Sequence, residues 1–480
     1  MELAAEMLII SLKSDDQFEV KEMERVKINN LGIPPLAGLC SYEDACKPGY
    51  DVNKNVDLLK RYTYVESRLN AIMAAHVTSV PEWEVKCALS LHLWLDAEHS
   101  AMLRKRITEM REPPLHLDKV PDPRLEAWLE EAIRAENTLE LLTGLYKVVK
   151  PAIVRAIKNH LAETNPLVDH PTCRILKFIL LEEEEMIAWG EQAIAGLSTN
   201  ETGRQIVSNY ENRLLAFLQD AGGIAGDEPK SPDHRMPSPR WGGEPYEMDV
   251  QPKRDARFVD NYNSAAKIDE YYVNESLPSD ERTYALLYKR LREMDVPEWM
   301  GPIIYKTKGK PWEYYVDLSR QLWDEARHSM MGEVGVYQHG VAFYSYPIEF
   351  KTTEALNKGA TPLEAHIVLW YIEQSLMPKE TGKRWEWVIA KQSDNELAAY
   401  FQDYDWADEV LHAQIGRKWL VGEAGGLEEL KRIGGQVMEA NLARKTDLDR
   451  LSDQKQWWPA FLAEIRAGKE RIGKSVMQSK

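Results

Sequence analysis

The sequence predicts an all-α protein that contains two four-helix units in tandem. Apolar residues recur at spacings of three and four along most of the chain, and the strict alternation typical of strands is nearly absent. A stretch rich in glycine and proline divides two halves that resemble each other, which indicates an internal duplication. With 480 residues, 44% of them hydrophobic, the chain can bury more than one sizeable core.

Composition and periodicity divide the chain into five segments. These are an irregular arm over residues 1–55, a helical unit over 56–220, a linker over 221–277, a second helical unit over 278–421 and capping helices over 422–480. The arm lacks a sustained helical period. The linker contains paired glycines and several prolines, a composition that sustains neither helix nor strand.

Each helical unit is expected to contain four main helices. In the first unit an apolar stripe begins at Val56, and further helices are expected over about 82–110, from about 123 through Glu136, and over about 171–197. In the second unit helices are expected over about 278–294, 311–337, 362–378 and 394–421. Prolines near most of these boundaries support the assignment, because proline interrupts a helix interior but is tolerated in the first turn.

The two units share a register around their second helix. The residues Trp83, Glu84, Leu89, Ser90, Leu93 and Trp94 match Trp312, Glu313, Leu318, Ser319, Leu322 and Trp323 with the same spacing. The same alignment places Asp96 on Glu325 and His99 on His328. A matching glycine near the last helix of each unit places Glu183 on Glu409, so that Met186 falls where His412 stands.

Two Glu-x-x-His segments carry the chemistry of the second unit. Residues three apart on a helix project from the same face, so each Glu and His can contact one metal ion. Two such pairs, with a further carboxylate from each of the other two helices, form the inward ligand set of a dinuclear site. The expected ligands are Glu281, Glu325, His328, Glu373, Glu409 and His412.

An aspartate stands directly before each ligand glutamate of these segments. A residue one position earlier on a helix is turned by about 100°, toward the neighbouring ligand helix. Because metal-bound histidines usually donate their other ring N–H to a carboxylate, we expect Asp324 to accept from His412 and Asp408 to accept from His328. These aspartates, with the adjacent Arg327, are the expected outer support of the site.

The first unit keeps only part of this pattern. Its corresponding residues are Glu66, Asp96, His99, Glu136, Glu183 and Met186. A thioether is a soft ligand and a poor match for ions held by oxygen and imidazole. Leu95 also stands where the second unit has Asp324. The first unit is therefore predicted to be a decayed copy, and both metal ions are expected in the second.

Charge and cysteine content limit the partners and the compartment. A net charge of −17 argues against nucleic acid or an anionic membrane as a partner, since both require a basic face. Four scattered cysteines do not form a disulfide framework, which favours reduced thiols and the cytoplasm. The segment Met7–Ile10 lacks the features of a signal peptide, and no apolar run reaches membrane-spanning length.

The segment from Asp324 to His328 resembles the Asp-Glu-x-Arg-His signature of bacterial multicomponent monooxygenase hydroxylases and related diiron oxidases and desaturases. At these residues the chain is similar to the ferritin-like superfamily of dinuclear carboxylate proteins, over about 56–197 and 278–421. The resemblance implies a ferritin-like bundle in each half and two iron ions, with manganese as the alternative metal. It also implies that Glu325, His328, Glu409 and His412, completed by Glu373 and Glu281, are the ligands.

Iron chemistry at such a site indicates an oxidase or oxygenase that activates dioxygen and oxidises a small organic substrate, with an electron donor as a further partner. No catalytic residue beyond the metal ligands is expected. The side chains of His366, Trp370, Tyr371 and Met377 either line a substrate pocket or belong to the core. The alternatives are a metal-buffering protein, a manganese site that disproportionates peroxide, and a site that only stabilises the fold.

Overall fold

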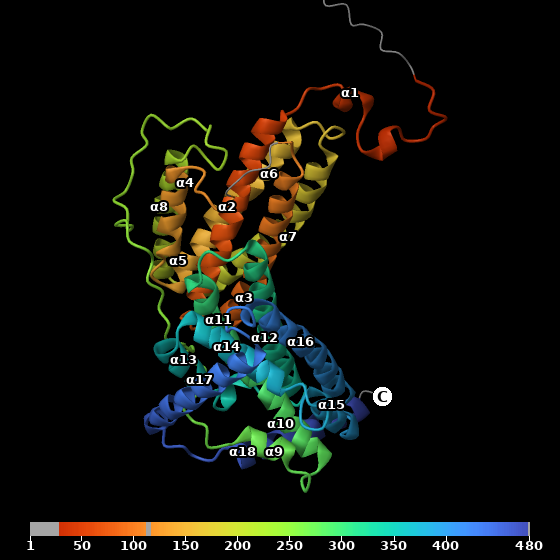
Figure 1. Cartoon of the computed structure of the whole chain (residues 1–480), viewed down its shortest axis with the longest axis vertical. Coiled ribbons are helices and arrows are strands. Elements are labelled where there is room, and N and C mark those ends of the chain that lie inside the picture. Colours follow the sequence, from red (N-terminus) through yellow and green to blue (C-terminus); the bar gives the residue numbers. More distant parts are fainter. Residues whose placement is uncertain (1–27, 112–116, 479–480) are drawn as a thin grey trace, which may run out of the picture. The chain divides into compact units, whose positions relative to one another are not determined.

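The computed structural model describes residues 28–111 and 117–478 (Figure 1). These residues contain helices and no strand, which confirms the all-α prediction. Part of the predicted arm, residues 1–27 with Met7–Ile10, lies outside the described residues. Residues 28–48, with the short helix α1 (Tyr42–Ala45), form a small compact unit with Asn165–His170. In it the side chain of Asn165 donates to the carbonyls of Ala45 and Lys47.

The remaining residues form one large helical unit. Its first half contains α2 (Val52–His76), α3 (Trp83–Thr108), α4 (Pro123–Ile133), α5 (Thr138–Thr143), a π-helix (Gly144–Val149), α6 (Lys150–Glu163), α7 (His170–Leu197) and α8 (Glu201–Asp220). The predicted extent of the helix from about 123 through Glu136 is wrong, because α4 ends at Ile133. A second helical run then begins where Asn137 caps α5.

The second half contains α9 (Ile268–Val273), α10 (Ser279–Arg292), α11 (Asp295–Lys306), α12 (Trp312–Tyr337), α13 (Lys351–Gly359), α14 (Pro362–Ser375), α15 (Lys383–Gln392) and α16 (Glu396–Leu420). The chain ends in α17 (Leu427–Asp447) and α18 (Trp458–Gln478). The sequence did not predict α11, because Pro297, Gly301 and Pro302 lie within it and resemble a loop. It also did not predict α15, which begins at the buried Lys383.

Local sequence fixes where the site helices begin. Thr361 and Glu364 form a reciprocal capping box at the start of α14, with Pro362 in the first turn. Asn395 caps α16 by accepting from the backbone N–H of Ala398. These caps satisfy amides that the helix cannot satisfy itself and so fix the register of the carboxylate and imidazole side chains that follow.

The two halves meet over a shared core. Helix α3 packs against α12, and α2 packs against α11 (Figure 1). The indole of Trp312 donates to the carbonyl of Ala97 at 2.9 Å, and that of Trp83 donates to Glu333 at 3.0 Å. One continuous hydrophobic cluster includes Leu59 from the first half and Leu369 from the second. The two helical units predicted from the sequence therefore lie within one compact unit.

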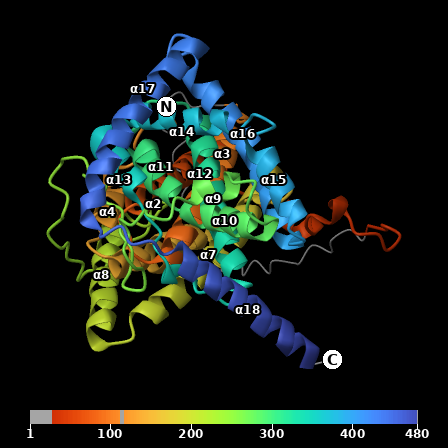
Figure 2. The same ribbon diagram turned by 90° about the horizontal axis from the view of Figure 1, so that it is seen from below.

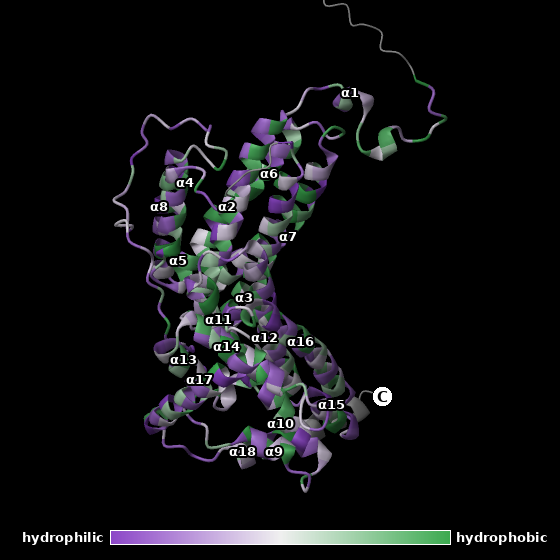
Figure 3. Cartoon of the chain, in the orientation of Figure 1, coloured by the Kyte–Doolittle hydropathy of each residue, from purple (hydrophilic) through white to green (hydrophobic). Residues whose placement is uncertain are grey.

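The segment predicted as a linker also packs on these helices. The guanidinium of Arg254 is buried against Glu298 of α11, and the ring of Phe258 lies tilted against that of Trp83, with centroids 5.5 Å apart. In the last helix, Phe461 of α18 contacts Tyr288 of α10 with ring centroids 5.0 Å apart. Figure 2 shows α18 extending away from the other helices. Figure 3 shows polar and apolar residues interspersed along the helices. Among the described residues, no helix combines the length and apolarity needed to cross a membrane.

Close approach between helices depends on glycine at matching places. A Cβ added at Gly190 in α7 would lie 2.1 Å from the ring of Tyr146. A Cβ at Gly416 in α16 would lie 2.4 Å from the ring of Trp370. Each glycine therefore lets an aromatic side chain of the neighbouring helix pack directly on its backbone.

Gly190→Ala is expected to lower the free energy of unfolding by about 1–3 kcal/mol, because overpacking forces Tyr146 from its place. Gly196→Ala in the same helix is the matched control, since a Cβ there meets no atom within 4 Å. That control should gain up to about 1 kcal/mol from the higher helix propensity of alanine. Denaturant unfolding of both variants measures the difference. Equal stability of the two would contradict the packing.

Candidate metal centre

Four helices bring carboxylates and imidazoles together in the second half. Residues Glu325, Glu373, Glu409 and His412 form one group, which we call position A. Residues Glu293, Glu325 and His328 form a second group, which we call position B. Within each group the ligand atoms lie within 4.8 Å of one another, close enough to hold a metal ion, and Glu325 belongs to both groups.

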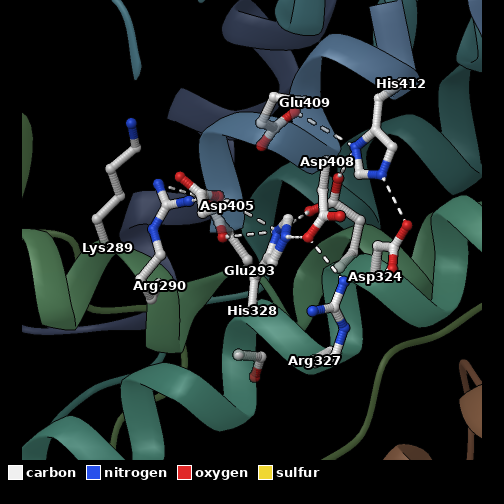
Figure 4. A network of polar contacts seen from close by, with 12 residues as sticks. Lys289, Arg290, Glu293, Asp324, Arg327, His328, Asp405, Asp408, Glu409 and His412 are labelled. Atoms are coloured by element: carbon white, nitrogen blue, oxygen red, sulfur yellow. Dashed lines mark hydrogen bonds and ion pairs between the residues drawn. The ribbon is translucent and has the colours of Figure 1, made fainter. Parts of the chain in front are cut away.

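Figure 4 shows members of both groups, with Glu409 beside His412 and Glu293 beside His328. In position A, His412 Nδ1 lies 3.1 Å from Glu325 Oε1 and 3.3 Å from Glu409 Oε2. In position B, His328 Nδ1 lies 3.7 Å from Glu325 Oε2 and 3.6 Å from Glu293 Oε2. The two oxygens of Glu325 thus face different histidines, as in a bridging carboxylate.

Several of these inward atoms are buried and lack a hydrogen bond within the described residues. They are Glu325 Oε1, His328 Nδ1, His412 Nδ1, Glu409 Oε2 and Glu293 Oε2. Leaving a buried polar atom unpaired costs about 1–3 kcal/mol, so these converging atoms either face one another as proton-bearing ion pairs or share a bound cation. A cation that accepts nitrogen and oxygen ligands satisfies all of them at once, which is the sense in which the residues fit a metal.

The outer nitrogens of both histidines are paired as expected from the sequence. Nε2 of His328 donates to Asp408 Oδ2 at 3.1 Å, and Nε2 of His412 donates to Asp324 Oδ2 at 3.4 Å. Each aspartate therefore supports the histidine of the opposite helix and leaves Nδ1 pointing inward. Arg327 joins the two supports, because its guanidinium contacts Asp324 at 2.6 Å and Asp408 at 2.7 Å.

The structure places Glu281 elsewhere, so its expected role as a ligand is corrected. Its carboxylate pairs with Arg466 of α18 at 2.9 Å. The carboxylate that α10 delivers is Glu293, which caps the helix at the break before α11. Spacing was the available signal: Glu66 and Asp96 are 30 residues apart, Glu293 and Glu325 are 32 apart, and Glu281 is 44 residues before Glu325.

A buried lysine, which the sequence analysis missed, also reaches the centre. Lys383, the first residue of α15, places its Nζ 2.7 Å from Glu409 Oε1, 2.9 Å from Asp405 Oδ1 and 3.7 Å from Glu293 Oε1. The guanidinium of Arg290 contacts Asp405 and also lies 2.9 Å from Glu293 Oε1 (Figure 4). In Glu409 and Glu293 these cations contact Oε1, and Oε2 faces a histidine of the centre.

Proton affinities in the centre show an excess of negative charge. Burial alone would lower the pKa of His328, but Asp405, Asp408 and Glu325 outweigh it and raise the pKa to about 10. Burial and the nearby carboxylates of Glu409 and Glu325 raise the pKa of Glu373 well above its usual range. Protons therefore serve as the counter-charge when no metal is bound.

A related but smaller cluster lies in the first half. Its members are Glu66, Asp96, His99 and Glu183, all buried, with ligand atoms within 4.8 Å of one another. His99 Nε2 pairs with Glu182 at 2.8 Å, and its Nδ1 faces Glu66 at 3.6 Å. The first cluster lacks a counterpart of Asp324 but keeps one outer support, since Glu182 pairs with His99 as Asp408 pairs with His328.

Lys150 occupies the interior of this first cluster. Its Nζ lies 2.7 Å from Asp96 Oδ1 and 2.9 Å from Glu183 Oε1. Lys150 follows Tyr146 by four residues and Glu373 follows Trp370 by three, and each of these rings packs on the matching glycine of α7 or α16. The π-helix over Gly144–Val149 takes up the extra residue, so a lysine stands where the second half has a ligand glutamate.

Glu136 is not part of the first cluster, which corrects the expectation that it corresponds to Glu373. It lies between α4 and α5 with a side chain 70% exposed, near Arg240. The reason is the interruption of the helix after Ile133, which moves the inward position to Lys150. Met186, the other predicted member, is buried in α7, as its alignment with His412 requires.

The four residues considered for a pocket beside α14 lie in different surroundings. His366 is buried with Nδ1 3.2 Å from the hydroxyl of Tyr314, and Trp370 is buried against Gly416. Tyr371 packs on Gly434 of α17, and Met377 lies half-buried after the end of α14. For His366 and Trp370 the structure favours the core role over the pocket role.

Comparison with known proteins adds no identification. The sequence matches no family model, and neither the curated proteins nor the solved structures yield a match. The interpretation of the centre therefore rests on its own residues: converging unpaired nitrogen and oxygen atoms, paired outer nitrogens and an excess of carboxylates.

Lys150→Met is expected to create metal binding in the first cluster, because it removes the ammonium from among Glu66, Asp96, His99 and Glu183. Metal content after loading with Mn²⁺, measured by elemental analysis, should rise by one ion per chain. Circular dichroism of the variant controls for folding. A folded variant that binds no more metal than the parent would show that Lys150 does not fill the site.

Proposed function

We propose that the chain is a non-haem dinuclear oxidase or oxygenase, with iron as the metal, that uses dioxygen to oxidise a small organic substrate. The observation that carries the proposal is the sharing of Glu325 between two groups, each completed by one histidine and further carboxylates. The resemblance of Asp324–His328 to the diiron signature supports iron, and four-helix bundles of this family use the same ligand types. Manganese is the alternative metal, since both ions accept this ligand set.

The residues divide into those that would hold metal and those that orient them. Position A would hold one ion through Glu325, Glu373, Glu409 and His412, and position B another through Glu293, Glu325 and His328. When bound, two iron ions supply the electrons that dioxygen needs to become an oxidant. Asp324 and Asp408 fix the ring orientation of the histidines and increase their basicity.

Burial of the site protects this chemistry. The imidazoles of His328 and His412 are fully buried, and Glu325, Glu373 and Glu409 are nearly so. Exclusion of water strengthens each charge interaction within the centre and prevents loss of oxidising equivalents to solvent. Glu373 is the residue suited to hold a proton at its carboxyl, because burial and Glu409 raise its pKa.

Oxygen consumption by the iron-loaded protein tests this function. We expect uptake that depends on an added reductant, with loss of both uptake and bound iron in His328→Ala. His99→Ala is the matched control, because it removes the equivalent imidazole of the first cluster and should leave uptake unchanged. Equal losses in the two variants would mean that the first cluster also works. Iron bound without any uptake would favour metal buffering or a structural role, and peroxide disproportionation by the manganese form alone would favour that alternative.

Metal affinity is expected to rise with pH. In the metal-free protein the pKa of His328 is raised to about 10, so below that pH a metal ion must displace a proton from the ring. The proton competes more strongly at low pH, and affinity should rise about tenfold per pH unit for each proton displaced. Mn²⁺ titrations from about pH 6 to about pH 8 measure the slope. An affinity that does not change over this range would contradict the raised pKa.

A further inference from the structure

A tryptophan of the first half lies against the outer support of the metal centre. Trp94 of α3 is half-buried, and the guanidinium carbon of Arg320 in α12 lies 5.1 Å from the centre of its ring. Arg320 in turn donates from Nε to Asp324 Oδ2 at 2.8 Å. The same oxygen accepts from His412 Nε2 at 3.4 Å. Three contacts in sequence therefore join a ring of the first half to a histidine of the second.

Asp324 depends on its partners because its side chain is completely buried. Arg327 contacts Oδ1 at 2.6 Å, whereas Arg320 and His412 share Oδ2. Burying an ionised carboxylate is costly unless it is paired, so Arg320 keeps Asp324 charged and holds Oδ2 beside the imidazole. A carboxylate fixed at this place orients the ring and increases its basicity as a ligand.

Arg320 is the exposed member of this set of contacts. Its side chain is 36% exposed, whereas that of Asp324 is 0% exposed. An exposed arginine loses conformational freedom when it holds a single ion pair, and for this reason such pairs contribute little. A ring beside the guanidinium reduces that loss, because cation–π attraction is strongest for tryptophan and holds the planar cation in one place.

The two halves differ in the residues that this ring can hold. Leu91 aligns with Arg320, and Leu95 aligns with Asp324. In the first half two leucines thus replace the guanidinium and the carboxylate together, whereas both halves keep the tryptophan. The joint replacement indicates that Arg320 and Asp324 act as one unit. The cation beside the ring of Trp94 comes from the second half.

We propose that Trp94 is a positioning residue for the metal centre of the second half. It holds Arg320 in place, and through Arg320 it fixes Asp324 as the acceptor of His412 Nε2–H. The inference rests on the proposed metal site and adds a role for the half that lacks a complete one. Without the ring, Arg320 turns to solvent and Asp324 loses one of its two guanidinium partners. The imidazole of His412 is then less firmly oriented, and a divalent ion binds more weakly.

The Mn²⁺ affinity of the metal-free protein, measured by calorimetry, tests this role. Trp94→Leu is expected to lower the affinity by about three- to tenfold. This is less than the loss of about 10- to 100-fold that follows removal of a direct outer partner, because Trp94 acts one contact further out. Trp94→Phe keeps an aromatic face and should restore most of the affinity. A folded Trp94→Leu protein that binds like the parent, or a Trp94→Phe protein as weak as Trp94→Leu, would overturn the proposal.

Trp189→Leu is the matched control. Trp189 is also a half-buried tryptophan of the first half, and the centre of its ring lies 5.5 Å from that of His92 and 5.6 Å from that of Tyr146. This variant should leave the affinity for Mn²⁺ nearly unchanged. A loss as large as that of Trp94→Leu would mean that any such substitution in the first half disturbs the centre, which contradicts a specific role. Circular dichroism of each metal-free variant controls for folding.

A double-mutant cycle shows whether Trp94 acts through Arg320. Arg320→Met should lower the affinity for Mn²⁺ at least as much as Trp94→Leu does. The double variant should bind like Arg320→Met alone, because the ring then has no cation to hold. Losses that multiply in the double variant would show that the two side chains act independently, and the proposal would fail.

These outcomes are distinct from those that test the proposed function. If the parent binds no Mn²⁺, the metal centre is refuted, and this inference is refuted with it. If the parent binds Mn²⁺ but the cycle shows no coupling, only the role of Trp94 is refuted. The expected coupling in a protein that consumes no oxygen would uphold the positioning role and contradict the oxidase.

Discussion

The main physical constraint on the second half is the repulsion between carboxylates that lie close together in its interior. Burying an ionised carboxylate is costly unless a partner compensates it, and the second half gathers the buried carboxylates of Glu325, Glu373, Asp405 and Glu409 beside the partly buried Glu293. Lys383 and Arg290 compensate only one face of this group. The remaining negative charge raises the pKa of Glu373 and of His328. Protons therefore neutralise it unless cations displace them.

The surrounding helices keep this unfavourable arrangement in place. Asp324, Asp408 and Arg327 form a closed set of ion pairs behind the two histidines, so both rings present Nδ1 to the interior. Shared packing with the first half supports the same helices, because α12 lies against α3 and the indole of Trp312 is held by the carbonyl of Ala97. The first half thus contributes rigidity to a cluster whose carboxylates and imidazoles all come from the second half.

Residues that lie on uninterrupted helices could be predicted from the sequence. The pairs Glu325 with His328 and Glu409 with His412 follow from the geometry of one turn, and the cross-pairing of Asp324 and Asp408 follows from a rotation by one residue. The all-α class follows from apolar periodicity over whole helices.

Residues beside helix breaks could not be predicted in the same way. Glu293 lies at the break between α10 and α11, Lys383 begins a helix after a tight loop, and Lys150 follows a π-helix that shifts the register by one residue. Helical periodicity cannot be extended across such breaks. The prediction that Glu281 and Glu136 face the clusters assumed uninterrupted helices, and it was wrong for that reason. Lysine is usually exposed, so the sequence indicated surface positions for Lys150 and Lys383. Their ion pairs with buried carboxylates explain why they are buried.

The central claim is that one carboxylate, Glu325, joins two metal positions in the second half. Anomalous diffraction from crystals of the iron-loaded protein, collected on both sides of the metal absorption edge, tests it most directly. We expect two peaks per chain, one beside His412 and one beside His328, each within bonding distance of an oxygen of Glu325. A peak among Glu66, Asp96 and His99, or an absence of peaks near Glu325 in metal-replete crystals, would contradict it.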